Sequence, residues 1–414
     1  MRLLILLGLL GLSWAAVWKT ELVYQKSKMR RMIAEGTWAA HLQKKHAVKA
    51  EALKANPHFL GSYPQKVYDY EDEEYLGNVT IGTPEQSLGF DCAFECEDAF
   101  CCDYVSQKYK NLKWLNYTRQ PEVLKTACDG KARYDYTKSS TFVRGFGDGF
   151  DIYYGTGSAY GFLGVDTVRF GEVGSNQLVV PKTTFGMAIH LADFFAEDPI
   201  DGILGLAFTS LSVSGSTPVF INAVKQGLVD APLFTVYLGM VGFQDGVFGG
   251  VYTWGGIDQD NCGDILAYVP LQSATYFQYQ MTDVSSGTYT FTPRFKWSVI
   301  SDTGTSFIGG PQKQVFAIAD EMGASYDRKN EVFEIPCNAT IPDIVFTIGG
   351  NKYPVTQKNL IVTAGDDVDF CYLAIFPFGG DDIDWILGDP FIREYCHIFD
   401  IGQKRIGLMT VKKK

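Results

Sequence analysis

Residues Val299–Ser306 read VISDTGTS, in which two apolar residues and a serine lead into an aspartate and a glycine-containing turn. Later in the chain, Trp385–Asp389 reads WILGD, with two apolar residues before a glycine. The first half has a matching pair, because LGFD at Leu88–Asp91 is followed by GILG at Gly202–Gly205. The two patterns therefore each occur twice, which predicts two related lobes that each present one aspartate.

The sequence beyond the first 75 residues is typical of a β-protein. Short runs rich in β-branched and aromatic residues alternate with glycine turns, as in Pro232–Tyr252. Helical periodicity is confined to short stretches, of which Pro218–Gln226 and Gln312–Met322 are the best. We therefore expect a mostly-β molecule of two lobes related by a pseudo-twofold axis, with the break between them in residues 238–262.

The first 16 residues have the features of a secretory signal peptide. Arg2 supplies a positive charge, Leu3–Leu12 is a largely apolar run, and Ala15 and Ala16 offer a cleavage point. This run is too short to span a membrane, and no other stretch approaches 18 apolar residues. We expect a protein without a membrane span that is secreted or delivered to a lumenal or lysosomal compartment. Three sequons are compatible with glycosylation, at Asn78, Asn116 and Asn338.

The charge of the chain is unevenly distributed. Residues 17–65 carry nine Lys/Arg and three Glu, a net charge of +6, and residues 17–55 have helical spacing of Met29, Ile33 and Trp38. Because the whole chain has a net charge of −11 and Arg2 adds +1, residues 66–414 carry −18. A solvated helical linker is one interpretation of the basic stretch, but we favour a propeptide that covers the acidic body until it is removed. The acidic body argues against nucleic acid as a partner.

Four segments follow from these boundaries. They are a signal peptide at 1–16, a basic propeptide at 17–65, an N-terminal lobe at 66–245 with Asp91, and a C-terminal lobe at 246–414 with Asp302.

Nine cysteines in a chain with a secretory leader predict disulfides, and the odd number leaves at least one thiol free or paired with another chain. One group lies in the first half, at Cys92, Cys96, Cys101, Cys102 and Cys128, and its pairing stays open. The other group lies in the second half, at Cys262, Cys337, Cys371 and Cys396. The first group lacks the CxxC…CxxC spacing of a zinc site, so we expect no metal.

Two aspartates from two lobes, Asp91 and Asp302, have a chemistry in common. Like charges a few ångströms apart cannot both ionise cheaply, so such a pair shares one proton near acid pH. The charged carboxylate can activate a water while the protonated one polarises a peptide carbonyl. Both carboxylates must be held rigidly in position. A glycine permits the tight turn that this needs, and nearby Ser or Thr hydroxyls can donate hydrogen bonds to the carboxylates.

These motifs resemble those of the pepsin family of aspartic proteases. Asp302–Ser306 is similar to the second active-site motif, and Tyr154–Ser158 (YGTGS) is similar to the flap hairpin that closes over the substrate. Asp201–Gly205 and Trp385–Asp389 resemble the two supporting strands. Ile81–Pro84 resembles the start of the mature enzyme, and residues 30–46 resemble the family propeptide. The sequences around Leu191–Asp193 and Arg393–Cys396 are most similar to those of nematode members.

The resemblance implies a bilobal pepsin-like fold with Asp91 and Asp302 as the catalytic pair. It implies a flap made by Tyr154, Gly155, Thr156 and Gly157, and active-site support from Thr303, Gly304, Thr305 and Ser306. It also implies a disulfide between Cys337 and Cys371, with Cys262 and Cys396 as a second pair. It further implies a monomer that binds an extended polypeptide substrate between its lobes and, before activation, its own propeptide. Such a protein needs no metal or organic cofactor.

The first active-site motif departs from the family pattern. The family has Asp-Thr-Gly-Ser and then Ser-Asn-Leu-Trp, whereas Asp91 is followed here by Cys92, Ala93 and Phe94. Cysteine is a weak hydrogen-bond donor, alanine disfavours a positive φ, and phenylalanine lacks the hydroxyl that would hold the carboxylate. Asp98 stands where the family has the tryptophan that partners the flap tyrosine.

Three hypotheses remain open at this point. The first is an aspartic endopeptidase, made as a zymogen and working in acid. The second is an inactive homologue that keeps the cleft and binds peptides, and the altered motif after Asp91 separates it from the first. The third is a secreted structural or decoy protein, against which the flap and the propeptide weigh. We expect the carboxylates of Asp91 and Asp302 to face each other across the cleft.

Overall fold

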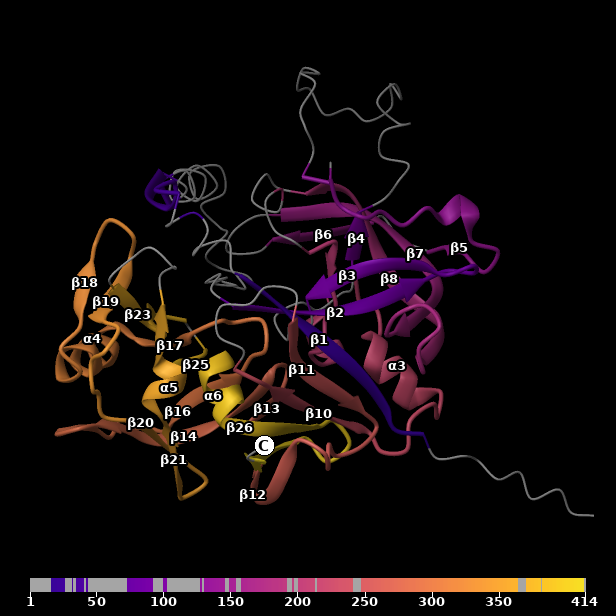
Figure 1. Ribbon diagram of the computed structural model, residues 1–414. Coiled ribbons are helices and arrows are strands. Elements are labelled where there is room, and N and C mark those ends of the chain that lie inside the picture. Colours follow the sequence, from indigo (N-terminus) through magenta and orange to yellow (C-terminus); the bar gives the residue numbers. More distant parts are fainter. Residues whose placement is uncertain are drawn as a thin grey trace, which may run out of the picture.

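The computed structural model of the protein describes most of the chain beyond residue 72. The described residues are 16–26, 32, 35–40, 42–43, 73–91, 100–102, 127–128, 130–145, 149–153, 158–191, 196, 200–212, 214–240, 247–363, 370–380 and 382–412. Strands dominate the regular structure and the helices are short (Figure 1), so the expected mostly-β, bilobal fold is confirmed.

The strands of the described ranges form three sheets. The largest has 14 strands, of which 13 run in the order β12 (Cys262–Pro270), β27 (Arg405–Val411), β26 (Tyr395–Asp400), β10 (Leu233–Leu238), β11 (Val247–Trp254), β1 (Trp18–Lys26), β2 (Glu73–Ile81), β3 (Gln86–Asp91), β9 (Gly202–Ile203), β4 (Phe100–Cys102), β8 (Leu178–Leu191), β7 (Ser158–Phe170) and β5 (Val143–Arg144), while β6 (Phe150–Tyr153) pairs with β7.

The other two sheets belong to the second half of the chain. One has the order β21 (Asn351–Val355), β20 (Ile344–Ile348), β14 (Phe277–Ser286), β16 (Trp297–Ser301), β25 (Trp385–Leu387), β17 (Ile308–Pro311) and β24 (Ile375–Phe378), with β13 (Ser273–Ala274) and β15 (Tyr289–Phe291) paired to β14. The small sheet has the order β18 (Ser325–Asp327), β19 (Val332–Pro336), β23 (Phe370–Leu373) and β22 (Ile361–Thr363).

Short helices connect the strands. The α-helices are α3 (Val219–Lys225), α4 (Gln312–Glu321), α5 (Gln357–Leu360) and α6 (Asp389–Glu394), and two 3₁₀ turns are η3 (Tyr136–Lys138) and η5 (Thr209–Leu211). Helices α3 and α4 lie within the stretches 218–226 and 312–322 that the sequence indicated, and a proline precedes each of them.

The internal repeat appears directly in the strand pairing. In the second half, β16 is parallel to β25, β25 is antiparallel to β17, and β17 is parallel to β24. In the first half, β3 is parallel to β9, β9 is antiparallel to β4, and β4 is parallel to β8. In the first half Asp91 is the last residue of β3, and in the second half Asp302 directly follows β16. The matching Ile-Leu-Gly triplets begin in β9 and in β25 and end just beyond them.

Strand β1 crosses the middle of the molecule between β2 and β11 (Figure 1) and pairs with both. The helical spacing noted for residues 17–55 is wrong for this part, because Thr20, Leu22 and Tyr24 alternate with more exposed neighbours and are themselves buried. That period of two is the pattern of a strand. Further along, residues 38–40 and 42–43 are helical, as the spacing predicted.

An aromatic cluster joins the two larger sheets. Phe399 of β26 stacks on Phe234 of β10 with ring centroids 5.0 Å apart, and Phe277 of β14 meets Phe399 edge-on at 4.8 Å. Trp254 of β11 lies 5.3 Å from Phe234. All four side chains are completely buried, and burial of each contributes about 2–3 kcal/mol. The lobes therefore share one continuous core beneath the interlobe strands.

Two disulfides lie in the second half of the chain, Cys262–Cys396 and Cys337–Cys371, with Cα–Cα distances of 5.9 and 4.9 Å. These are the two pairings expected above. Cys128 is also disulfide-bonded. Each bridge lowers the entropy of the unfolded chain, and the first closes a loop of 134 residues.

Candidate active site

Asp302 directly follows a strand that is buried along its whole length. All five residues of β16 are buried, and the strand runs parallel to β25, with Ser301 opposite Leu387. The backbone N–H of Asp302 donates to the carbonyl of Leu387 at 3.1 Å. The position of Asp302 is therefore fixed by backbone pairing on the side of the supporting strand.

The carboxylate of Asp302 is completely buried and bonded at both oxygens. The N–H of Gly304 donates to Oδ1 at 3.1 Å, and the hydroxyl of Thr305 donates to Oδ2 at 2.5 Å. Thr303 and Ser306 are buried beside them. The supporting role that the resemblance implied for Gly304 and Thr305 thus corresponds to two direct hydrogen bonds to the carboxylate.

The glycine of the WILGD motif allows the supporting strand to approach this turn. A Cβ atom at Gly388 would lie 2.0 Å from the carbonyl oxygen of Thr305 and 2.2 Å from that of Phe307. The next residue, Asp389, donates its N–H to the same Thr305 carbonyl at 2.9 Å. Any larger residue at 388 would push the supporting strand away from the turn that carries Asp302.

Asp91 is the last residue of β3, and its backbone pairs with Ile203 of β9. Its side chain and residues 92–99, including Asp98, lie outside what the structure describes, so the predicted approach of the two carboxylates stays a prediction. The predicted flap residues Tyr154, Gly155, Thr156 and Gly157 lie outside the described ranges as well. Strands β6 and β7 on either side of them form an antiparallel pair that ends at Tyr153 and Ser158.

The two half-sites differ in register. In the second unit Ser301 pairs with Leu387, so Asp302 is level with the glycine of its Ile-Leu-Gly triplet. In the first unit Asp91 pairs with Ile203, the isoleucine of its own triplet. The backbone of Asp91 therefore lies two residues, or about 7 Å, away from the equivalent position along its supporting strand.

Two residues that the sequence did not indicate converge on Ser301, directly before Asp302. They are Tyr279 of β14 and His397 of β26, and both side chains are completely buried. The one signal in the sequence is a histidine within the otherwise apolar start of the run YCHIFD. Its partner is 96 residues away in the chain, which no local pattern reveals.

Strand β1 is tied to the second half of the chain by an ion pair as well as by the sheet. Lys19 Nζ lies 2.5 Å from Asp260 Oδ2 and 3.4 Å from Asp258 Oδ1. Although burial acts to raise the pKa of Asp258, hydrogen bonds from Asn261 and from backbone N–H groups, together with the charge of Lys19, hold that pKa below its usual value. Asp258 therefore remains ionised into mildly acidic solution.

A second contact of the basic segment is apolar. Trp38 and Leu42 are buried in a cluster with Ile300 and Ile386, which pair with each other in β16 and β25 close to Asp302. The indole N–H of Trp38 donates to the carbonyl of Asn330 at 3.0 Å. Trp38 and Leu42 thus pack close to β16, which precedes Asp302, and to β25.

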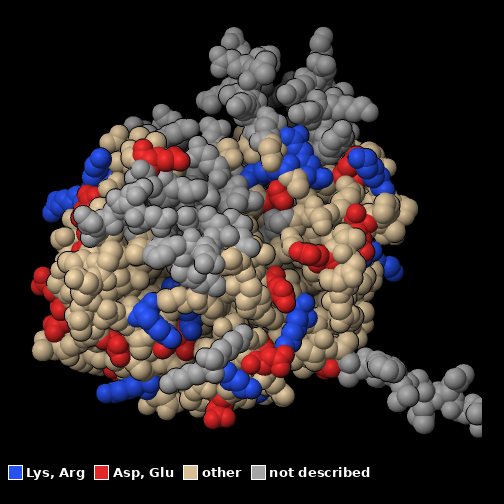
Figure 2. Space-filling model, in the orientation of Figure 1, with Lys and Arg blue, Asp and Glu red and all other residues tan. Residues whose placement is uncertain are grey.

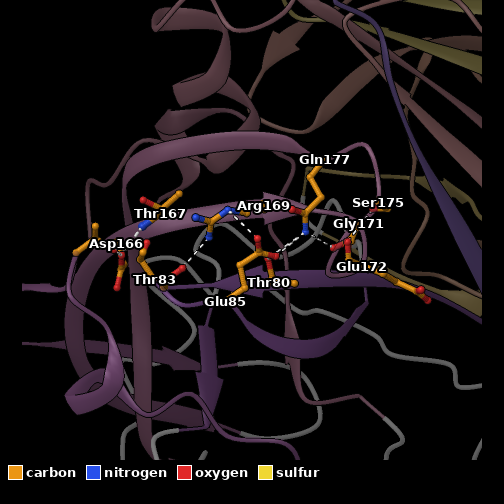
Figure 3. Close-up of polar contacts among 12 residues, drawn as sticks. Thr80, Thr83, Glu85, Asp166, Thr167, Arg169, Gly171, Glu172, Ser175 and Gln177 are labelled. Carbon is orange, nitrogen blue, oxygen red and sulfur yellow. Dashed lines mark hydrogen bonds and ion pairs between the residues drawn. The ribbon is translucent and has the colours of Figure 1, made fainter.

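A polar network holds the turn after β2 (Figure 3). Arg169 donates from a terminal nitrogen to the carbonyl of Gly82 at 2.7 Å, and its Nε lies 3.7 Å from Glu85 Oε1. Glu85 Oε2 accepts from Thr80 and from Gln177, each at 3.0 Å. The stretch that resembles the start of the mature enzyme is therefore fixed by side chains from β2, from β7 and from the turn before β8.

A further buried carboxylate in the first lobe has a structural role. Asp166 accepts hydrogen bonds from the hydroxyls of Tyr134, Ser139 and Thr141 at 2.5–2.6 Å and from the N–H of Thr167 at 2.7 Å. Four donors satisfy a buried carboxylate fully, so this aspartate stabilises the loop that covers β7.

The described ranges contain no helix long and apolar enough to cross a membrane. Within the same ranges, His, Cys, Asp and Glu residues form no group of three that is placed to hold a metal ion. On the face shown in Figure 2, acidic and basic side chains are interspersed.

Comparison with known proteins gives a consistent result over the whole chain. The model of the eukaryotic aspartyl protease family matches residues 74–411. Aspartic protease 6 of Caenorhabditis elegans is 46% identical over 100% of both chains, and aspartic protease 2 of Necator americanus is 37% identical over 99% of each. Pepsin A of Rhinolophus ferrumequinum is 33% identical over 99% of this chain and 100% of its own length.

Proposed function

Because this chain belongs to the eukaryotic aspartyl protease family, we propose that it is an endopeptidase that hydrolyses polypeptides in acid with Asp302 and Asp91 as its catalytic pair. The observation that carries this proposal is the way in which the carboxylate of Asp302 is held. Its buried carboxylate accepts hydrogen bonds from Gly304 and Thr305 at the end of a buried strand. An aspartate that merely ended a turn would not need two donors and a glycine at the facing position 388.

In the proposed reaction the two carboxyl groups share one proton. The ionised carboxylate takes a proton from water as the water oxygen bonds to the peptide carbonyl carbon, and the protonated carboxyl donates to the carbonyl oxygen. The resulting diol collapses, the C–N bond breaks, and the amine leaves with a proton from the pair. Flap residues Tyr154–Gly157 would cover the extended substrate and exclude water.

The proposal includes synthesis as a zymogen with residues 17–65 as the propeptide. Three features support it: the central position of β1, the ion pair of Lys19 with Asp258 and Asp260, and the packing of Trp38 beside the second half-site. Acid would protonate the carboxylates and weaken the attraction, after which cleavage near residues 63–75 would release the segment. The mature monomer would comprise lobes 66–245 and 246–414.

The same proposal places the protein outside the cell or in a lysosomal compartment. The signal peptide at 1–16 would direct it there, and the disulfides Cys262–Cys396 and Cys337–Cys371 are typical of proteins that fold in an oxidising compartment. N-linked glycans at exposed sequons would accompany that route.

A second candidate function is an inactive homologue that binds peptides. It is favoured by two observations on the first half-site. The motif after Asp91 lacks the threonine, glycine and serine that would hold the carboxylate, and the strand ending at Asp91 is shifted by two residues relative to the strand before Asp302. Misplacing a catalytic group by about 1 Å can already lower the rate roughly a hundredfold.

An assay of the refolded full-length chain distinguishes these functions. We expect cleavage of denatured protein at acid pH that is inhibited by a peptide-like transition-state analogue and abolished by Asp302→Asn. Asp320→Asn, which alters an exposed carboxylate in α4, is the control for the loss of one acidic group. A wild type that binds the analogue without cleaving supports the peptide-binding function, and one that neither cleaves nor binds contradicts both.

A further inference from the structure

Ser301, the residue immediately before Asp302, is the centre of a buried hydrogen-bonded chain. The hydroxyl of Tyr279 lies 2.7 Å from Ser301 Oγ, and Nε2 of His397 lies 3.0 Å from the same atom. Relative exposures are 0% for Tyr279 and His397 and 1% for Ser301. Water therefore does not compete for these bonds, and each polar atom depends on its protein partner.

The partners determine where each proton lies. Nδ1 of His397 is 2.7 Å from the carbonyl oxygen of Tyr395, and a carbonyl can only accept, so Nδ1 carries the proton. Nε2 of the neutral ring is then an acceptor, so the hydroxyl of Ser301 donates to it. Ser301 Oγ in turn accepts from the hydroxyl of Tyr279. The chain runs in one direction, from tyrosine to serine to histidine to backbone.

The chain links elements of two different sheets at the base of the active-site turn. His397 lies in β26 of the largest sheet, whereas Ser301 and Tyr279 lie in β16 and β14 of the second sheet. The backbone of Asp302 is fixed on its other side by the bond to Leu387. His397 of β26 thus holds Ser301, and β25 holds the next residue, Asp302, from another side.

We propose that His397 is a positioning residue for Asp302, which acts through Ser301 and holds the catalytic turn in place only while the imidazole is neutral. This inference rests on the proposed endopeptidase function and adds to it a control of that function by acid. A protonated Nε2 would donate to Ser301 Oγ, which already accepts from Tyr279. The serine hydroxyl would then lose its acceptor and the chain would have to rearrange beside Asp302.

No other charged group compensates His397 within the surroundings that the structure describes. The hydrogen-bonded chain brings the titratable group of Tyr279 next to Ser301, and Asp302 follows Ser301 in the sequence. The residues that face it from β10, β27, α6 and its own strand are apolar: Val236, Leu408, Phe391 and Phe399. Burial lowers the pKa of His397 to about 4, although the bond to the Tyr395 carbonyl opposes this shift. The ring is therefore neutral through mild acid and becomes charged in strong acid.

The test compares kcat and KM across pH 2.5–6 for wild type, His397→Leu, His397→Gln and Ile398→Val. Leucine removes the acceptor, and we expect kcat at pH 5 to fall about tenfold with KM changed less than twofold. Glutamine can still accept from Ser301 through Oε1, so it should restore at least a third of kcat. We expect the activity of the wild type to decline near pH 4 and both variants to lose this decline. Ile398→Val is the matched control, because its side chain packs in a separate cluster with Cys262 and Cys396.

Circular dichroism at pH 6 establishes that each variant is folded before its kinetics are compared. If folded His397→Leu keeps the wild-type kcat and the same acid decline, His397 is a core residue only and the inference fails while the peptidase function stands. If glutamine behaves like leucine, the positioning role through Ser301 is wrong. A wild type that neither cleaves nor binds the transition-state analogue overturns the proposed function, and this inference with it.

Discussion

The hydroxyl of Thr305 is the shortest contact to the carboxylate of Asp302, at 2.5 Å, and both side chains are completely buried. A hydrogen bond to a charged group contributes about 1.5–3 kcal/mol. Thr305→Val keeps the shape and removes the donor, so we expect kcat to fall about ten- to a hundredfold with little change in KM. Thr305→Ser, which keeps the hydroxyl, should remain within about fivefold of wild type. Equal activities of the valine and serine variants would contradict this role.

His397 also links stability to pH. Its pKa is lowered by burial to about 4 in the folded protein, whereas the ordinary value is 6.5. As the pH falls below 6.5 the unfolded chain binds this proton and the folded chain does not, so the free energy of unfolding decreases until about pH 4 and then levels off. The decrease is of the order of 3 kcal/mol.

Urea unfolding at pH 7, 5.5 and 4 checks this contribution. Asp302→Asn provides a background that cannot digest itself, and His397→Leu in that background removes the titrating group. The unfolding free energy of the protein with His397 minus that of the leucine variant should be about 3 kcal/mol lower at pH 4 than at pH 7. A difference independent of pH would show that the buried imidazole does not titrate as described.

At the level of single residues, local motifs predicted what local contacts determine. Asp302, Gly304 and Thr305 lie within four consecutive positions, so their mutual bonds follow from one turn. The pair formed by His397 and Ser301 could not be predicted in this way. Its geometry depends on how two sheets pack, and the isolated histidine in the run YCHIFD does not reveal that Ser301 is its partner.

Among the elements, β1 is held partly by charge, because Lys19 forms ion pairs with Asp258 and Asp260. Asp258 has a lowered pKa, so the ion pair is present at neutral pH and is lost as the pH falls through that pKa. Lys19→Met should therefore raise the pH at which the full-length chain converts to a shorter form, by about half a unit for a half-exposed pair.

Gel electrophoresis after incubation at a series of pH values measures this conversion. Lys313→Met removes the same charge from the exposed start of α4 and serves as the control. A Lys19→Met protein that converts at the wild-type pH would mean that the sheet alone retains β1.

The sequons at Asn78 and Asn338 lie in different surroundings, one in a strand and the other in a turn. Asn78 lies within β2 and donates to Glu172 at 2.8 Å, and the hydroxyl of Thr80 in the same sequon is buried. Asn338 is exposed in the turn after Cys337. We expect a glycan at Asn338 and none at Asn78, while the sequon at Asn116 lies outside the described ranges. Enzymatic deglycosylation should produce a mobility shift that Asn338→Gln reduces and Asn78→Gln leaves unchanged, and the reverse pattern would contradict the assignment.

The element scale also shows why part of the fold was predictable. Helices α3 and α4 are amphipathic or buried segments behind a proline, and such signals are local. Strand β1 was missed because the lysines and alanines that follow it dominate the helical spacing of residues 17–55. The alternation of Thr20, Leu22 and Tyr24 was present in the sequence and is short enough to be overlooked.

On the scale of the whole molecule, the two halves repeat one strand topology but hold their aspartates differently. Restoring Cys92→Thr, Ala93→Gly and Phe94→Ser together should supply the missing donors and the tight turn, and we expect acid peptidase activity to rise at least tenfold. The matched control is the same triple change combined with Asp302→Asn, which should be inactive. Wild-type activity typical of an intact family member, unchanged by the triple substitution, would show that the altered motif does no harm.

Strand β1 is an interior strand, and its departure has a mechanical consequence. Neighbouring strands lie about 4.8 Å apart, so its loss would leave β2 and β11 separated by about 10 Å, each with a row of unpaired N–H and C=O groups. Unpaired edges are templates for association with other chains. If residues 17–65 are removed as proposed, these edges would stay unpaired until another strand fills or closes the gap, and we expect the protein to be most prone to aggregate during that interval.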